Sequence, residues 1–287
     1  MSVRMPVVAG AFYPAAPAAC RREVELCLQG VEHPLFEKQI LAGVVPHAGW
    51  VYSGPTAARV FAAIASQQHP ETIILFGAVH RWGVNSPSLY PEGSWRTPLG
   101  DVAIDVELGQ AILDEAGGLV ASNAAAHEDE HSIEVQLPLI QHLLPEVRIV
   151  PIAVPPEATA LDLGAYIARA VQKLGRRVVA IASSDLTHYG PRYGFAPAGA
   201  GQRGLDWARK NDSQLLLLAQ NLQAEELLLT ADRQRSACGA GAIAAAITFA
   251  IGLGATRGEL LHYTTSYDVM PTGQPSEQVG YGAVIFV

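Results

Sequence analysis

The strongest constraint on the fold is an alternation of apolar, β-rich runs with stretches of helical periodicity. Six runs have strand length and composition: Ile40–Pro46, Thr72–Ala78, Val147–Val154, Arg177–Ser183, Leu260–Tyr267 and Tyr281–Val287. Apolar residues three or four apart predict helices at Ala18–Gln29, Thr56–Gln67, Val106–Ala116, Ser132–Leu144, Ala158–Leu174, Leu205–Gln220, Ala224–Thr230 and Gly239–Ile251. This alternation predicts an α/β fold, with a mixed, mostly parallel sheet flanked by helices.

The chain has no feature that would divide it into separate domains. It has 287 residues, of which 49% are hydrophobic and 16% charged, a balance that suits a sheet covered by apolar helices. No Ser- or Pro-rich linker and no internal repeat interrupts the pattern. We therefore predict a single domain over residues 1–287.

The charge and hydropathy of the sequence limit the kinds of partner and the cellular compartment that we expect. The formal net charge is −8 and no run of Lys or Arg occurs, so we expect no nucleic-acid partner. The first residues, MSVRMPVVAGAFYP, contain no apolar signal-peptide core, and the apolar stretch Ala240–Leu253 is too short to span a bilayer. Three cysteines make no disulfide framework. A cytoplasmic protein without a membrane partner is the prediction.

Polar residues follow three of the predicted strands. His47 comes after the first in VVPHAGWVYSG, His80 after the second in LFGAVHRWG, and Asp185 and His188 after the fourth in SSDLTHYG. In a parallel sheet, strand C-terminal ends share one edge, so residues far apart in sequence converge there. Each histidine alone could be an ordinary turn residue, but the repeated position favours a shared site.

Cys238 adds a third candidate metal ligand. It precedes an apolar helical run, so its sulfur would lie near a helix N-terminus, where the thiolate is favoured. Two imidazoles and one anionic ligand are typical of open mononuclear sites, and we predict a metal held by His47, His80 and Cys238. Without the histidines, Cys238 would be interpreted as a small buried cysteine, as Cys20 and Cys27 are.

Other polar segments suggest acid–base and pocket residues. Asp185 and His188 lie three apart, so the carboxylate could orient the imidazole; an Asx-type turn with an exposed histidine explains the segment equally well. His188 is the predicted acid or base. The Pro- and Gly-containing segment Tyr189–Gln202 predicts a surface loop that could cover the site.

Two further motifs compete with this interpretation. His127–His131 is a literal H-E-x-x-H, but its acids resemble a helix N-terminus, which would leave His127 outside the helix. Gly239, Gly241 and Ala244 imitate a dinucleotide-binding fingerprint, but the polar segment before them is not a strand. Both are the weaker hypotheses.

Several motifs together resemble the Memo-like family, of the AmmeMemoRadiSam system protein B type. They are PVVAGAFYP, VPHAGWVYSG, the GAVH turn, EDEHSIEVQLP, SSDLTHYG and CGAG, in family order over residues 6–241. Two departures, AVHR at residues 78–81 and GAGA after Cys238, affect the outer pocket rather than the metal ligands.

The resemblance implies a fold similar to class III extradiol ring-cleavage dioxygenases and an iron or copper site. His47, His80 and Cys238 match the family's metal-site residues, and His188, with Asp185 beside it, corresponds to the dioxygenase catalytic histidine. His131 and Glu134 would belong to the pocket wall. The family also implies radical-SAM and AMMECR1-like proteins as partners.

Three functions remain open at this point. The first is a non-haem iron enzyme with redox or dioxygenase-like activity, in which His188 and His131 move protons. The second is a non-catalytic module that binds a peptide or another small ligand, and the third is a zinc hydrolase. Aromatic residues near the predicted pocket, Trp50, Tyr52, Trp82 and Tyr189, suit either of the first two. Iron is the expected metal, with copper or zinc as alternatives.

Overall fold

Four parallel strands form the centre of the main sheet. In the computed structural model, which describes residues 2–31, 36–273 and 276–287, the order is β2 (Ala42–Val45), β9 (Val178–Ser183), β3 (Thr72–Gly77) and β8 (Arg148–Ala153). Every residue of β2, β9 and β3 is buried. Continuous apolar strands of this kind are expected where helices cover both faces of a sheet.

Antiparallel strands extend the sheet at both edges. β12 (Gln278–Phe286) pairs antiparallel with β2, with β11 (Gly258–Thr265) and, at Gln278 and Val279, with β10 (His188–Tyr189). At the opposite edge, β4 (Ser88–Leu89) pairs antiparallel with β8 and parallel with β7 (Ala121–Ser122). A separate small sheet contains β1 (Val3–Arg4), β5 (Ser94–Thr97) and β6 (Gly100–Ala103). The predicted mixed sheet is confirmed.

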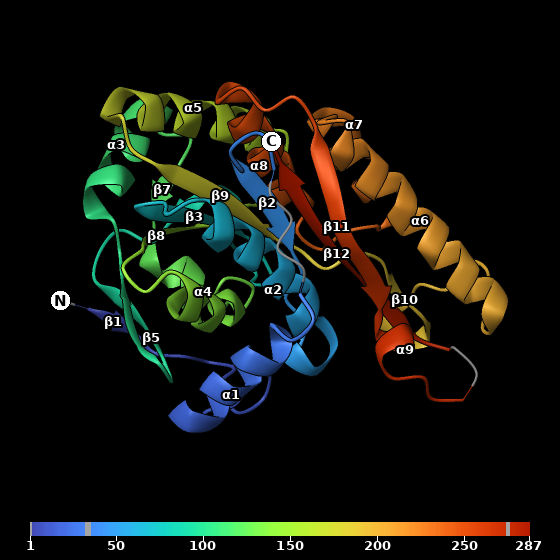
Figure 1. The fold of residues 1–287 in the computed structure, drawn as a ribbon. Helices are drawn as coiled ribbons and strands as arrows, with labels where there is room; N and C mark the ends of the chain where they lie inside the picture. The colour runs from blue at the N-terminus through green and yellow to red at the C-terminus, as the bar shows by residue number, and fades with distance from the viewer. Residues whose placement is uncertain (1, 32–35, 274–275) are drawn as a thin grey trace.

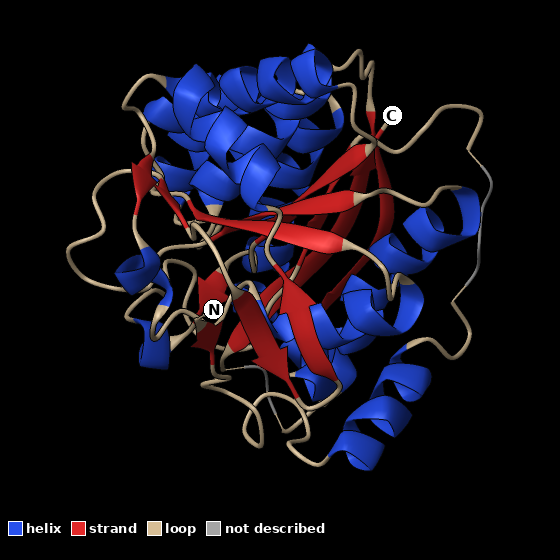
Figure 2. Ribbon diagram, turned by 90° about the vertical axis from the view of Figure 1, so that its left-hand side faces the viewer, coloured by secondary structure: helices blue, strands red, loops and turns tan. Residues whose placement is uncertain are grey.

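Helices cover both faces of the sheet (Figures 1 and 2). Ile74 and Phe76 of β3 belong to one core and Ile73 and Leu75 to the other, as the alternation of side chains along a strand requires. The helices of the first core are α3 (Val106–Ala116), α5 (Thr159–Leu174), α6 (Gln202–Gln220), α7 (Ala224–Gln234) and α8 (Ala240–Gly252). Those of the second are α1 (Pro17–Cys27), α2 (Trp50–Gln67) and α4 (Leu137–Leu143). A short helix, α9 (Ser266–Val269), joins β11 to the segment before β12.

Two predicted helices differ from the structure. α2 begins at Trp50 rather than after Pro55, so Pro55 lies inside the helix, where it has no N–H to donate to the carbonyl group of Val51. The stretch predicted as one helix over residues 132–144 is a 3₁₀ turn, η2 (Glu134–Gln136), followed by α4. The first turn of α4 contains Pro138, a residue that suits a helix start. In the described part of the chain, no helix is both long and apolar enough to cross a membrane.

Close packing of α5 on α8 depends on a glycine. A Cβ atom at Gly164 of α5 would overlap the hydroxyl of Thr248 and the carbonyl oxygen of Ala245, both in α8. By contrast, a Cβ at Gly109 of α3 would lie 3.6 Å from Leu89 Cδ2, an ordinary contact. The two helical glycines therefore differ in packing.

We predict that Gly164→Ala destabilises the protein, because one added methyl group in a filled interface costs about 1–3 kcal/mol. Gly109→Ala is the matched control, and alanine in an uncrowded helix should stabilise by about 0.5–1 kcal/mol. Urea unfolding followed by circular dichroism measures both. Equal effects of the two substitutions would contradict the assigned packing.

Candidate metal centre

Two histidines meet because their strands are near neighbours. His47 lies two residues beyond the end of β2, and His80 lies three residues beyond the end of β3. β9 separates these strands and ends just before Asp185. All three strands run parallel, so their C-terminal ends place His47, His80 and Asp185 at one edge of the sheet.

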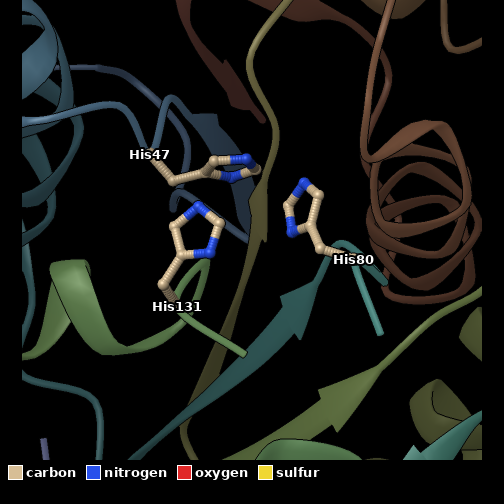
Figure 3. A group of neighbouring side chains, drawn as sticks. All are labelled: His47, His80 and His131. Carbon is tan, nitrogen blue, oxygen red and sulfur yellow. The ribbon is translucent and has the colours of Figure 1, made fainter. Parts of the chain in front are cut away.

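A third histidine completes a compact cluster. His131, in the segment between the 3₁₀ turns η1 (Ala124–His127) and η2, joins His47 and His80, and the ring centroids are 4.8–5.4 Å apart. One nitrogen from each ring lies within 4.8 Å of the others, an arrangement that could hold a metal ion. Figure 3 shows the three rings facing a common space.

Cys238 lies beside this cluster. Its Sγ is 3.2 Å from Nε2 of His47, and its backbone N–H donates to the carbonyl oxygen of Asp185. Gly239 permits this approach, because a Cβ there would lie 2.7 Å from the carbonyl oxygen of Ser183. Burial acts to raise the pKa of the thiol, but the imidazoles of His47 and His80 outweigh it and lower the pKa of Cys238 to about 7. The thiolate is therefore accessible near neutral pH.

Glu130 fixes the orientation of His80. Its carboxylate accepts hydrogen bonds from the His80 backbone N–H at 2.8 Å and from Nδ1 at 3.0 Å, and from the Ser132 N–H at 2.9 Å. A carboxylate can only accept, so Nδ1 of His80 keeps its proton and Nε2 is the nitrogen that faces the cluster. Burial opposes protonation of His80, but its bonds with Cys238 and Glu130 raise its pKa to about 10.

The pKa of His131 is shifted in the opposite direction to that of His80. Burial and the neighbouring rings of His47 and His80 lower the pKa of His131 to about 4. Glu130 Oε1 is 3.7 Å from its Nδ1, too far for a strong hydrogen bond. The ring is neutral at pH 7, the form in which imidazole binds metals.

A buried hydroxyl fixes the tautomer of His47. Ser183 Oγ donates to the carbonyl oxygen of Ser132 at 2.7 Å, and it accepts from Nε2 of Gln136 at 3.0 Å. The carbonyl oxygen of Pro46, 2.9 Å from the same Gln136 nitrogen, sets the orientation of the amide. Because the single Ser183 proton is used, its contact with His47 Nδ1, at 3.1 Å, requires Nδ1–H as the donor. The neutral ring therefore turns an unprotonated Nε2 to the cluster.

We predict that nitrogen-detected NMR of the metal-free protein, at a pH where the ring is neutral, shows His47 as the Nδ1–H tautomer. Ser183→Ala should abolish this preference, and Ser183→Thr, which keeps the hydroxyl, should retain it. Ser184→Ala is the control, since that hydroxyl contacts Asp185, Gly239 and the sulfur of Cys238 but makes no hydrogen bond to His47. A wild-type ring protonated on Nε2 would contradict the assignment.

Asp185 and His188 line a cleft in front of the cluster. The cleft has a volume of about 580 Å³ and is also lined by His47, His80 and His131. Asp185 Oδ1 accepts from the backbone N–H groups of His47, at 2.7 Å, and Ala48, and burial raises the pKa of its carboxyl group. The segment that contains His188 is therefore placed where a proton could be exchanged with a bound molecule.

The turn that presents His188 is fixed from behind by Asp212. The buried Asp212 carboxylate accepts from the Thr187 N–H at 2.9 Å and from the Tyr263 hydroxyl at 2.7 Å. Burial is the main cause that raises the pKa of Asp212 to about 7.

This carboxyl group should make the stability of the fold depend on pH. Between its ordinary pKa of 3.8 and about 7, the folded state binds the Asp212 proton and the unfolded state does not. Stability therefore falls as pH rises through this interval, by at most about 1.4 kcal/mol per pH unit. Asp212→Asn, which cannot ionise, should gain melting temperature relative to wild type between pH 5 and pH 8. Parallel melting curves over this range would contradict the prediction.

Three residues predicted for the pocket lie elsewhere, and these predictions are corrected. The Glu134 carboxylate is fully buried and bound by Arg4, Tyr13 and the backbone of residues 7–8. Trp50 is buried, with its Nε1–H donating to the Val135 carbonyl, and the buried Tyr189 donates to the Gly199 carbonyl. Each has its polar atom satisfied away from the cleft. Tyr52 does line the cleft, and Trp82 is 99% exposed.

The segment Tyr189–Gln202 is a loop only in part. It begins in β10 and contains a 3₁₀ turn, η3 (Pro191–Tyr193). Tyr193 lines the cleft and packs edge-to-face on His188, with ring centroids 5.0 Å apart. The segment therefore supplies one wall of the cleft.

The competing motifs do not form sites. His127 ends η1, its ring is buried against Tyr90 and Trp95, and burial lowers its pKa to about 4. It is not on a helix with His131, as a H-E-x-x-H zinc site requires. Gly241 lies against Pro155, where a Cβ would overlap the backbone, so this glycine serves helix packing.

The orienting residues Glu130, Ser183 and Gln136 were not predicted from the sequence. Glu130 stands in the acidic run before His131, which was interpreted as a helix N-terminus. Its side chain instead reaches back to His80, fifty positions earlier in the chain. The one signal in the sequence is that Glu130 directly precedes His131, a candidate site residue.

Comparison with known proteins agrees with the motifs. A family model described as "Memo-like protein" matches residues 4–285. The chain belongs to the Memo-like family. A "MEMO1 family protein" of Thermococcus onnurineus is 40% identical, covering 99% of both chains, and one of Methanococcoides burtonii is 39% identical with the same coverage. The predicted family resemblance is confirmed.

The fold of this Memo-like protein is also found at much lower identity. A crystal structure of the uncharacterized protein JW3007 from Escherichia coli K12 has a TM-score of 0.52 and 12% identity, and the match covers 86% of this chain and 100% of that one. At this identity the similarity concerns the fold alone.

Proposed function

We propose that this Memo-like protein binds one metal ion at the histidine cluster and uses it in redox chemistry on a small molecule held in the cleft. The observation that carries the proposal is the grouping of His47, His80 and His131 with their ligand nitrogens within 4.8 Å. Cys238 beside His47 supplies an anionic donor to the same space. We propose His47, His80 and Cys238 as ligands, with His131 as a further ligand or a proton carrier.

The charges around the cluster suit a cation. His80 lies in contact with the Glu130 carboxylate, and the thiol of Cys238 ionises near neutral pH. The raised pKa of His80 shows that these groups favour positive charge at this point. A metal ion would replace protons on His80 and Cys238, and metal binding should therefore release protons.

The donor set suits iron first, with copper and zinc as alternatives. Imidazole binds iron, copper and zinc, and thiolate adds a soft, charge-donating ligand. Such an ion supplies Lewis acidity and, for iron or copper, electron transfer. His188 and Asp185 at the cleft wall would hold or move a proton on the bound molecule. We also keep radical-SAM and AMMECR1-like proteins as proposed partners of the protein.

Metal content tests the proposal. The protein is purified without oxygen, incubated with ferrous, cuprous or zinc ions, desalted and analysed by elemental analysis and spectroscopy. We expect about one ion per chain. His47→Ala, His80→Ala and Cys238→Ser should lose it, and Glu130→Gln should weaken binding about 10–100-fold.

His69→Ala is the control, because His69 is exposed and lies outside the cluster. Equal metal content in the control and the cluster variants would indicate non-specific binding. No stoichiometric metal in any form would favour a non-catalytic module that binds a small ligand or peptide. Zinc bound in preference to iron and copper would favour the hydrolase.

A further inference from the structure

Two clefts meet at the histidine cluster. The second has a volume of about 480 Å³ and shares only His80, His188 and Tyr193 with the first. His47 and His131 line the first cleft, whereas Cys238 lines the second. The first cleft therefore reaches the cluster at the imidazoles of His47 and His131, and the second reaches it at the thiol of Cys238.

The walls of the second cleft are mainly apolar. They come from α7, from the link to α8 and from the segment after β8, through Leu228, Ala231, Ala237 and Pro156. α7 packs against α8, on the side of the molecule away from α1 (Figure 1). Such walls suit a ligand with a small apolar body.

Two opposite charges stand in these walls. Arg235 and Asp232 line the cleft and are exposed, and they do not form an ion pair with each other or with any other described residue. The Arg235 guanidinium donates to the carbonyl oxygens of Tyr193 and Gly194, both at 3.3 Å. A guanidinium has five N–H donors, so Arg235 retains capacity for a ligand.

Arg235 has a backbone conformation that is unusual for a residue other than glycine. It ends α7 in the left-handed region, with φ of 50°, a position where glycine is the ordinary residue. The side chain also stacks on Phe195, with Cζ 4.8 Å from the ring centroid. Arg235 therefore borders the cleft and contacts the segment that forms part of its wall.

We propose that the second cleft is a separate binding site for a small zwitterion of the amino-acid type. Its carboxylate would bind Arg235, its ammonium group Asp232, and its apolar part the wall of α7, within reach of Cys238. The site goes beyond the proposed function, and it requires no metal ion.

Four symmetric disulfides that share one core test the site: cystine, dithiodipropionate, cystamine and hydroxyethyl disulfide. They carry zwitterionic, anionic, cationic and uncharged ends. The Cys238 thiolate attacks one sulfur of the probe, the S–S bond breaks, and a mixed disulfide forms as the other half leaves as a thiolate. The cysteine is oxidised and the probe is reduced.

The rate of mixed-disulfide formation is measured by mass spectrometry on the metal-free full-length protein at one pH. Each rate is divided by the rate at which the same probe reacts with mercaptoethanol, which corrects for the intrinsic reactivity of the probe. Cys20 and Cys27 are buried, and Cys238→Ser gives the background. We expect cystine to exceed the uncharged probe by about fivefold, the effect of a partly exposed charge contact. Arg235→Gln should slow cystine and dithiodipropionate, and Asp232→Asn should slow cystine and cystamine.

Arg192→Gln is the matched control, because Arg192 is an exposed arginine of the first cleft. It should leave the order of the probes unchanged. Arg235→Lys keeps the charge and should retain part of the preference, which separates charge recognition from a loosened wall. Equal normalised rates for the four probes, an unreactive Cys238, or equal effects of Arg192→Gln and Arg235→Gln would overturn the proposal. Metal binding without probe selectivity would leave the proposed function intact.

Discussion

Parallel pairing of β2, β9 and β3 is the constraint on which the site depends. The three strands are adjacent and end at the same edge, which brings His47, Asp185 and His80 together from positions up to 138 residues apart. The strands are buried on both faces, so a shift of register would place apolar side chains against the wrong neighbours. The core therefore fixes the site geometry.

Around this edge, buried polar groups orient the reactive side chains. Glu130 holds His80, Ser183 holds His47, and Asp212 holds the turn before His188. Each connects segments that are distant in sequence, and Glu130 and Ser183 each leave an imidazole Nε2 facing the cluster. Partners of this kind set the tautomer and the orientation of a ligand, and this is how a fold prepares a metal site.

The cluster has two different sides. The imidazoles border a cleft that also contains Asp185 and His188, whereas the thiol borders a cleft with Arg235 and Asp232. Tyr193 and His188 stand between the clefts, and Arg235 holds the backbone of this wall through two carbonyl groups. Access to the histidine cluster and the shape of both clefts are thus linked through one short turn.

The sequence by itself determined the fold class, the family and the strand-end positions of His47, His80 and Asp185, because these follow from local periodicity and from motifs. The sequence did not determine which hydrogen-bond partners the polar side chains have in the folded protein. Glu134 was expected in the pocket but is bound by Arg4 and Tyr13, and Glu130 binds His80. The tertiary structure decided these roles, since a buried carboxylate binds whichever donors the packing of distant segments brings to it.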